Sequence, residues 1–211
     1  MPSAPDITRI VLTGGPCAGK TTILARIKSH FSELGYHVFL VPEAATVVIN
    51  TGFIPASFPG DQIYELQDAI LDLTLALYRQ TERLVQHLGR YPALIVYDRG
   101  SLDAKAYCTP AAWDRILQTR GVTEKELRDA PYHGIIHLVT AADGAPEHYS
   151  IFNNTARLES LAQAKAIDLR LREAWAGHPQ FHIVDNSTPF AAKVSRAMEI
   201  ISTLVPPRSS D

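Results

Sequence analysis

A glycine-rich segment between a strand-like run and a helix-like run restricts this chain more than any other feature. The run Thr8–Thr13, TRIVLT, is apolar and rich in β-formers, and Gly14, Gly15 and Pro16 end it. A helical pattern then continues to about Leu34. Glycines let backbone N–H groups turn inward, and the start of a helix adds a positive partial charge. This order of elements predicts a backbone pocket for phosphate groups.

The eight residues from Gly14 to Thr21, GGPCAGKT, match the P-loop pattern G-x-x-x-x-G-K-[ST] in full. In this pattern the lysine, Lys20, reaches the terminal phosphates, and the hydroxyl of Thr21 ligates Mg²⁺. A glycine turn with a chance lysine is the structural alternative. We interpret Cys17 as a small filler rather than a redox-sensitive thiol. The sequence thus predicts binding of ATP or GTP with Mg²⁺, and the residues assigned to the nucleotide here are Gly14, Gly15, Pro16, Cys17, Ala18, Gly19, Lys20, Thr21 and Thr22.

Strand-like and helix-like patterns alternate along the rest of the chain. Further strands are predicted at 37–41, 93–97, 134–140 and 181–185. A long helix is predicted from an N-cap at Asp61 to Gly89, and two short helices are predicted within 110–130. A charged helix that ends at about residue 175 follows the fourth strand, and a last helix is predicted over 189–204. Such alternation predicts a parallel sheet covered on both faces. The expected fold is therefore a three-layer α/β/α sandwich with a five-stranded parallel sheet, of the small-kinase type.

The domain organisation is expected to be simple. With 211 residues and no internal repeat or linker, residues 1–211 fit one domain. Its core is expected over 7–204, with a lid-like region at about 141–175 and a flexible tail over 205–211.

Charge and cysteine content exclude some classes of protein. The formal net charge of −2 gives no general attraction to nucleic acid or to anionic membranes. Cys17 and Cys108 have no metal-ligand spacing and favour a reducing compartment. We see no signal peptide and no apolar run long enough to span a bilayer. A cytoplasmic protein is expected, and its oligomeric state is left open.

Acidic residues after two predicted strands are candidates for the chemistry. Asp98 ends ALIVYD, where an acid positions Mg²⁺, partly through water. Arg99 follows it and can stabilise transferring phosphoryl charge, or form a structural salt bridge instead. Glu43 follows the second strand, so it should face the same crevice and could accept the proton of an attacking hydroxyl. A solvated loop acid is the alternative for Glu43, and Thr46 could assist it.

Other polar residues give weaker signals. Arg157, in the charged region before residue 175, is the candidate lid arginine, although most charges there suit a solvated helix face. Asn186, after the fifth strand, could lie near the nucleotide base or simply form a turn. His137 lies within a strand, where a satisfied core histidine is expected rather than a metal ligand.

With these residues in hand, the chain resembles the AAA-28 family, which includes the ribosylnicotinamide kinase domain of a bacterial NAD-biosynthesis regulator. The segments that carry the resemblance are TGGPCAGKTT, VPEAAT and YDRG. The later segments HLVTAADGAPEHYS through NNTARLE, AWAGHP and IVDNS more closely resemble the eukaryotic translocation defect fourteen proteins and their bacterial relatives. The similarity runs from about Ile7 to Leu204.

The resemblance implies a P-loop fold and a bound nucleotide, and leaves the activity open. Kinase relatives phosphorylate a small nucleoside and use a glutamate after the second strand, as Glu43 is placed here. Asp98-Arg99 resembles the Asp/Glu-Arg pair of deoxynucleoside and thymidylate kinases. The translocation defect subgroup is instead associated with GTP and phosphoinositide binding. Ring-forming motors carry an Asp-Glu pair and a helical lid domain, neither of which is found here.

Two functions follow from these observations. The first is a kinase, or a slow NTPase, that transfers the γ-phosphoryl group of Mg-ATP or Mg-GTP to a small acceptor such as a nucleoside or nucleotide. The proposed catalytic residues are Lys20, Glu43, Asp98, Arg99 and Arg157. The second is a regulatory GTP- or ATP-binding protein without an acceptor. No lysine follows Asn or Thr, which argues against the N/T-K-x-D guanine motif of Ras-like switches.

Overall fold

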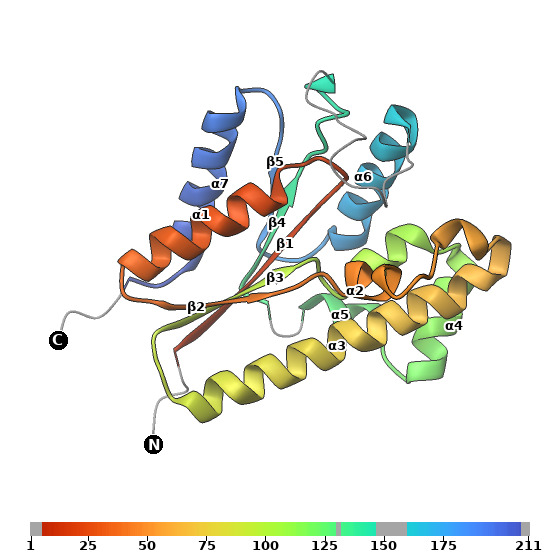
Figure 1. Ribbon diagram of the computed structural model, residues 1–211, viewed down its shortest axis with the longest axis horizontal. Coiled ribbons are helices and arrows are strands. Elements are labelled where there is room, and N and C mark those ends of the chain that lie inside the picture. Colours follow the sequence, from red (N-terminus) through yellow and green to blue (C-terminus); the bar gives the residue numbers. More distant parts are fainter. Residues whose placement is uncertain (1–5, 130–131, 147–159, 208–211) are drawn as a thin grey trace.

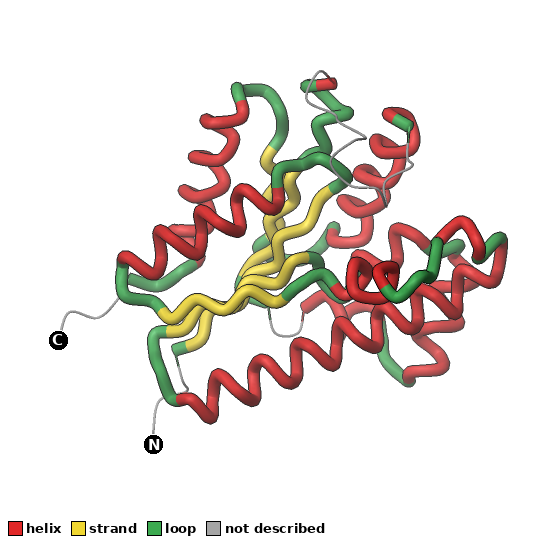
Figure 2. Tube along the Cα trace, viewed as in Figure 1, coloured by secondary structure: helices red, strands yellow, loops and turns green. Residues whose placement is uncertain are grey.

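A computed structural model describes residues 6–129, 132–146 and 160–207 of the chain. The described part contains one sheet of five strands in the order β2-β3-β1-β4-β5, and every neighbouring pair is parallel. Figure 2 shows the strands stacked between two groups of helices. The strands are β1 (Ile7–Gly14), β2 (His37–Val41), β3 (Ala93–Asp98), β4 (Gly134–Leu138) and β5 (Phe181–Val184).

Helices cover both faces of this sheet (Figure 1). On one face lie α1 (Lys20–Glu33) and α7 (Phe190–Leu204). The other face is covered by α3 (Ile63–Leu88), α4 (Pro110–Arg120), α5 (Glu124–Asp129) and α6 (Leu161–Trp175), and α2 (Ala44–Asn50) packs onto α3. The predicted three-layer α/β/α sandwich with a five-stranded parallel sheet is confirmed. No helix in the described ranges has the length and apolar character that crossing a membrane requires.

The alternation of side chains along the strands produces the two cores. Ile10 and Leu12 of β1 point to the face covered by α1 and α7, where they meet Ile23. Val11, between them, points to the opposite face and belongs to the core that includes Trp175. Because β1 and β3 are buried on both faces, their sequences are nearly continuous apolar runs.

Most predicted elements agree with the structure to within about one residue at each end, apart from three differences. Asp61 is not the N-cap of α3, because a single 3-10 turn over Gly60–Gln62 precedes the helix and Gln62 takes the cap position. The fourth strand ends at Leu138 rather than at residue 140. The short helix α2 was not predicted at all. The predicted left-handed end of α3 at Gly89 is confirmed by its φ of 63°.

The parallel sheet brings the candidate residues to one edge. The P-loop follows β1, Glu43 follows β2, and Asp98 with Arg99 lies at the end of β3. All these strand ends point the same way, so the loops after them face a common crevice. Part of the expected lid-like region, residues 147–159, lies outside the described residues, and α6 packs onto the core.

Candidate functional site

The P-loop has the backbone conformation that its sequence requires. Gly14 has a φ of 140°, and a Cβ at this position would lie 2.1 Å from the carbonyl oxygen of Leu138. Only glycine fits so close to a neighbouring backbone. Cys17 has a φ of 54°, a left-handed value that non-glycine residues rarely adopt. Gly19, with a φ of 93°, directly precedes the first residue of α1. The loop therefore turns tightly between β1 and α1.

Lys20 is the first residue of α1 and is only 8% exposed. Its Nζ donates to the carbonyl oxygens of Gly14, at 3.0 Å, and Gly15, at 3.3 Å. The ammonium group is thus held against the backbone at the start of the P-loop. Thr21 and Thr22, which follow it, are exposed.

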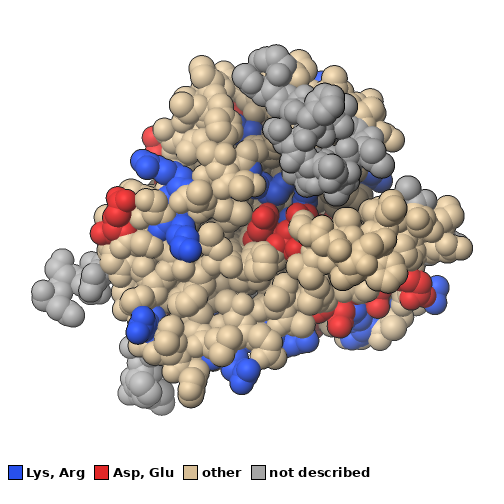
Figure 3. Space-filling view, viewed as in Figure 1, with Lys and Arg blue, Asp and Glu red and all other residues tan. Residues whose placement is uncertain are grey.

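A large cavity opens beside this loop, and we call it the loop cavity. Its volume is about 710 Å³. The lining includes every residue from Cys17 to Thr22, together with Glu43 and Asp98. On the face shown in Figure 3, acidic and basic side chains meet in a hollow near the centre of the molecule. The loop cavity has the size and position of a nucleotide site.

Asp98 is the last residue of β3 and lines the loop cavity. Its Oδ1 is buried and has no hydrogen-bond partner within the described residues. Burial raises the pKa of Asp98, and the nearby charge of Lys20 opposes this shift. Thr21, which is exposed, lines the same cavity, and a carboxylate oxygen with a threonine hydroxyl is a donor set that suits Mg²⁺. No group of three or more His, Cys, Asp or Glu that could hold a metal occurs in the described ranges, so most ligands would come from phosphates and water.

Arg99 has a strained backbone that its surroundings hold in place. Its φ is 72°, in the left-handed region. The Arg99 amide donates to the carbonyl oxygen of Leu12 at 3.0 Å, and its own carbonyl accepts from the hydroxyl of Tyr78. The guanidinium pairs with Glu43 and donates to the carbonyl oxygen of Gly14 at 3.3 Å. Such over-determined strain is typical of functional sites.

Glu43 lies between β2 and α2, directly before the first residue of α2, and forms an ion pair with Arg99. Its Oε1 accepts from Nε of Arg99, and its Oε2 accepts from the hydroxyl of Thr46 at 2.8 Å. Burial by itself raises the pKa of Glu43, but the positive charges of Arg99 and Lys20 outweigh it and lower the pKa to about 2. Glu43 is therefore ionised at neutral pH.

A second, smaller cavity lies on the other side of Glu43, and we call it the side cavity. Its volume is about 220 Å³. Glu43 lines both cavities, whereas Pro16 lines the side cavity and Cys17 the loop cavity. The P-loop and Glu43 thus separate a large cavity from a small one. A group bound in the side cavity would approach the loop cavity at Glu43.

The comparisons with known proteins agree with this geometry. The AAA_28 protein-family model, described as an AAA domain, matches residues 9–193. The chain belongs to this family. A search of curated proteins found no match. Among solved structures, this AAA_28 chain is similar to the deoxyadenosine kinase of M. mycoides, solved with bound dATP, at a TM-score of 0.63 and 15% sequence identity. The similarity covers 92% of this chain and 99% of the kinase chain, and at this identity it shows a common fold.

Asn186 lies in the wall of the loop cavity, where its amide is already engaged by protein groups. Its Nδ2 donates to the carbonyl oxygen of Thr140 at 2.8 Å, and its Oδ1 accepts from Nζ of Lys193 at 2.7 Å. Both ends of the side chain thus hold other parts of this AAA_28 domain, and the predicted place of Asn186 near the nucleotide base stays a prediction. Arg157, the candidate lid arginine, lies outside the described residues.

Lys193 of α7 is a buried cation that binds the backbone of the P-loop and lines the loop cavity. It is 2% exposed, and its Nζ donates to the carbonyl oxygens of Ala18, at 3.2 Å, and Val139, at 2.7 Å. Burial lowers the pKa of Lys193 to about 8, with the charge of Arg196 acting in the same direction and those of Asp168 and Asp185 opposing it. A charged lysine is thus kept inside the domain at a cost in stability.

The low pKa of Lys193 predicts a gain of stability at alkaline pH. Between about 8 and 10.5 the unfolded chain holds this proton and the folded chain does not, so unfolding becomes less favourable as pH rises. Relative to Lys193→Met, the wild-type free energy of unfolding should rise across this window by at most about 3 kcal/mol. Urea unfolding of both proteins from pH 7.5 to 10 measures it. A difference that stays constant with pH would contradict the assignment.

The sequence analysis missed Asp168 and Lys193, although the sequence contains a signal for both. Asp168 falls among the buried positions of α6, one turn from Ala164 and Leu171. Lys193 is followed at four-residue intervals by Ala197 and Ile201, which are buried in α7. A charge on the apolar stripe of an amphipathic helix must find buried partners. In this family member the partners lie in the P-loop and at the end of β4.

Proposed function

We propose that this protein is a kinase that transfers the γ-phosphoryl group of Mg-ATP or Mg-GTP to a hydroxyl group of a small acceptor in the side cavity. The observation that carries the proposal is the position of Glu43. Its carboxylate lines both cavities and is paired with Arg99, an arrangement that a protein binding only nucleotide does not need. The family and the fold support phosphoryl transfer in general.

In this proposal the loop cavity takes the donor. The P-loop residues Gly14 to Thr22 surround the phosphates, and Lys20 holds the terminal ones. Thr21 and Asp98 hold the metal, and the unpartnered Oδ1 of Asp98 supports this role. Mg²⁺, when bound, would neutralise negative charge on the phosphates. The similar kinase was solved with dATP, which supports a nucleoside triphosphate site here.

Glu43 acts on the acceptor hydroxyl. The hydroxyl oxygen attacks the γ-phosphorus, the bond to the bridging oxygen breaks, and the nucleoside diphosphate leaves with that electron pair. The hydroxyl proton passes to the Glu43 carboxylate. A carboxylate with a pKa of about 2 is a weak base. In a loose transition state the hydroxyl loses its proton late, so a well-placed hydrogen-bond acceptor is sufficient.

Arg99 is proposed to stabilise the charge on the transferring group. Its guanidinium lies between Glu43 and the carbonyl oxygen of Gly14, where the P-loop begins. It is held there by its fixed backbone and by Asp103, whose Oδ2 is 3.9 Å from Nη1. Preorganised charge of this kind needs little rearrangement when the phosphoryl group moves.

The lining of the side cavity favours an acceptor without a phosphate. Among its described lining residues, Arg99 is the only Lys or Arg, and it already faces the acids Glu43 and Asp103. Gln67 lines this cavity and is 5% exposed, and its side chain makes no hydrogen bond to the described part of the chain. An amide that faces a cavity without a protein partner favours a ligand that offers its own donors and acceptors. We therefore propose a nucleoside-like acceptor rather than a nucleotide.

Product formation with a panel of acceptors tests the proposal. The protein is incubated with Mg-ATP or Mg-GTP and either nucleosides, nucleoside monophosphates or sugar alcohols. Phosphorylated product and acceptor-dependent release of ADP or GDP are expected with nucleosides, and little with monophosphates. If nucleotide binds tightly but no acceptor yields a phosphorylated product, a regulatory NTP-binding protein is favoured, as in the translocation defect subgroup. Binding to phosphoinositide vesicles would then be the next measurement.

A further inference from the structure

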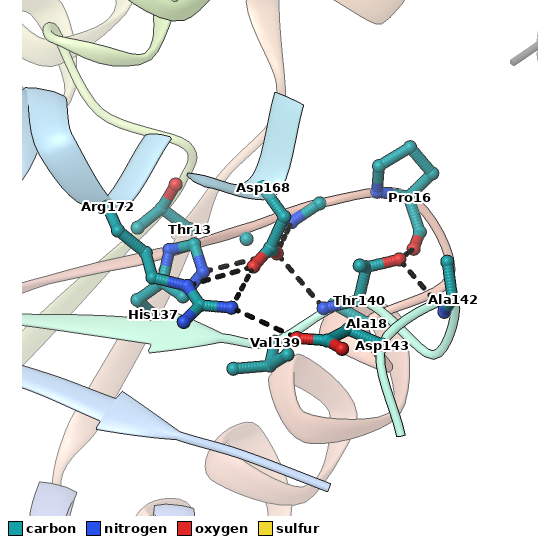
Figure 4. A network of polar contacts seen from close by, with 12 residues as sticks. Thr13, Pro16, Ala18, His137, Val139, Thr140, Ala142, Asp143, Asp168 and Arg172 are labelled. Atoms are coloured by element: carbon teal, nitrogen blue, oxygen red, sulfur yellow. Dashed lines mark hydrogen bonds and ion pairs between the residues drawn. The ribbon is translucent and has the colours of Figure 1, made fainter. Parts of the chain in front are cut away.

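Asp168 of α6 is a buried carboxylate at the back of the P-loop. It is 0% exposed and lies between the end of β4 and the loop (Figure 4). Its Oδ1 accepts from the backbone amides of Gly15 and Thr140, both at 3.0 Å. The same oxygen lies 3.2 Å from Nε2 of His137, and Oδ2 accepts two hydrogen bonds from Arg172. One carboxylate thus joins three parts of the chain that are distant in sequence.

Gly15 is shaped to admit this carboxylate. A Cβ at this position would lie 2.8 Å from Oδ1 of Asp168 and 3.0 Å from Cβ of Thr140. In the P-loop pattern this position accepts any residue. The glycine here is therefore explained by the close approach of Asp168, rather than by contact with a phosphate.

The contacts of Asp168 determine which way the first half of the loop faces. The N–H of Gly15 points to the carboxylate, and Pro16 has no N–H, so neither offers an amide to the loop cavity. The carbonyl of Pro16 accepts from the hydroxyl of Thr140, whose own amide is bound to Asp168. The residues that line the loop cavity begin at Cys17. Asp168 and Thr140 together hold the peptide units immediately before it.

The carboxylate is ionised in the folded protein. Burial raises its pKa, but the hydrogen bond to His137, the positive charge that His137 can carry and the bonds to Arg172 and Gly15 lower it to about 2. Nδ1 of His137 is buried and has no partner in the described ranges. With a proton on Nε2, His137 donates a hydrogen bond to the Asp168 carboxylate. Hydrogen bonds to a charged acceptor are stronger than those between neutral groups.

We infer that Asp168 is a positioning residue for the nucleotide site: by binding the Gly15 amide and the Thr140 segment, it fixes the loop so that the amides from Cys17 onward face the phosphates. The inference rests on the proposed function only in requiring that the loop cavity binds a nucleoside triphosphate. Asp168 itself touches neither cavity and acts through the backbone of Gly15.

The Asp168→Asn variant tests this role at constant size. In the wild type, the Gly15 and Thr140 amides and Nε2 of His137 converge on Oδ1, and the Arg172 guanidinium binds Oδ2. The asparagine side chain has only one acceptor oxygen. In either orientation, its NH₂ group therefore faces hydrogen-bond donors. The Kd for Mg-ATP or Mg-GTP, whichever the wild type binds, should rise about tenfold in calorimetry. The Gly15 amide proton should move upfield in the ¹⁵N-correlated NMR spectrum, because it loses a charged acceptor.

A matched control separates positioning from general loss of stability. Ile116→Val shortens a fully buried side chain of α4 outside the lining of both cavities, and should lower Tm while leaving the Kd and the Gly15 resonance unchanged. Gly15→Ala keeps Asp168 but forces its carboxylate away, because the added methyl group would lie 2.8 Å from Oδ1 of Asp168. It should reproduce the loss of affinity, and it decides the question if Asp168→Asn does not fold.

The outcomes distinguish the two proposals. If the wild type binds neither Mg-ATP nor Mg-GTP, the proposed function fails. If the wild type binds and both Asp168→Asn and Gly15→Ala bind equally well, the proposed function stands and the positioning role of Asp168 is wrong. A loss of affinity no larger than that of Ile116→Val at equal loss of Tm also overturns the positioning role.

Discussion

Replacing Lys20 with methionine is expected to lower the affinity for Mg-ATP and Mg-GTP by about a hundredfold or more. Methionine keeps the unbranched stem, which is buried with the rest of the side chain, and removes only the ammonium. That ammonium holds the carbonyl groups of Gly14 and Gly15 and faces the loop cavity. Its loss removes a charged contact to the terminal phosphates and one brace of the loop. Calorimetric titration with each nucleotide measures the effect.

Lys28→Met is the matched control for this experiment. Lys28 lies on the same helix, α1, and is exposed, so the net charge changes equally while the loop cavity does not. The control should bind nucleotide as the wild type does. Equal affinities of Lys20→Met and Lys28→Met would remove the basis for placing phosphates on this loop.

Much of the sheet and of the P-loop could be predicted, because the local sequence patterns agree with the packing that the fold requires. The strand β1, Gly14 after it and the start of α1 follow from a continuous apolar run and a motif whose first glycine leaves no room for a Cβ. The same holds for β3, whose two buried faces explain the unbroken sequence ALIVYD. Because all strands are parallel, the position of Glu43 near the P-loop also follows from topology alone.

Elements that depend on packing rather than on local pattern could not be predicted. Helix α2 has the sequence AATVVIN, and its β-branched residues disfavour a helix. It forms because Ala44 and Val48 pack against Leu66 and Ile70 of α3. The N-cap of α3 was predicted one residue too early for a related reason: the single 3-10 turn at Gly60–Gln62 has no signature of its own in the sequence.

Partners of polar groups are the second kind of information that the sequence lacks. Arg99 and Glu43 were predicted separately, and only the fold brings them together as an ion pair between the two cavities. A charge pattern in α6 suggested a solvated face, yet Asp168 turns inward to the Gly15 amide. The sequence separation of 153 residues between them explains why no local rule could find the contact.

Glu43→Gln is expected to lower kcat by about a hundredfold to ten-thousandfold without weakening the binding of nucleotide. Glutamine is nearly isosteric with glutamate, and its amide oxygen can still accept the hydrogen bond of Thr46. It cannot take the proton of the substrate hydroxyl. The carboxylate also lies near Lys20 in the loop cavity, where its negative charge opposes that of the phosphates. Removing the charge should therefore leave the Kd for Mg-ATP or Mg-GTP unchanged or lower it. Product formation and calorimetry on the same preparation measure both quantities.

The direction of the change in Kd separates a chemical role of Glu43 from a structural one. If Glu43 served only to hold Arg99, breaking their ion pair would disturb the start of the P-loop, because Arg99 also binds the carbonyl of Gly14. Nucleotide affinity and turnover would then fall together. Glu65→Gln, which removes an exposed acid in the first turn of α3, controls for the change in net charge. A large loss of kcat with intact or tighter nucleotide binding, absent in that control, requires Glu43 to act on the acceptor, since the donor is still held correctly.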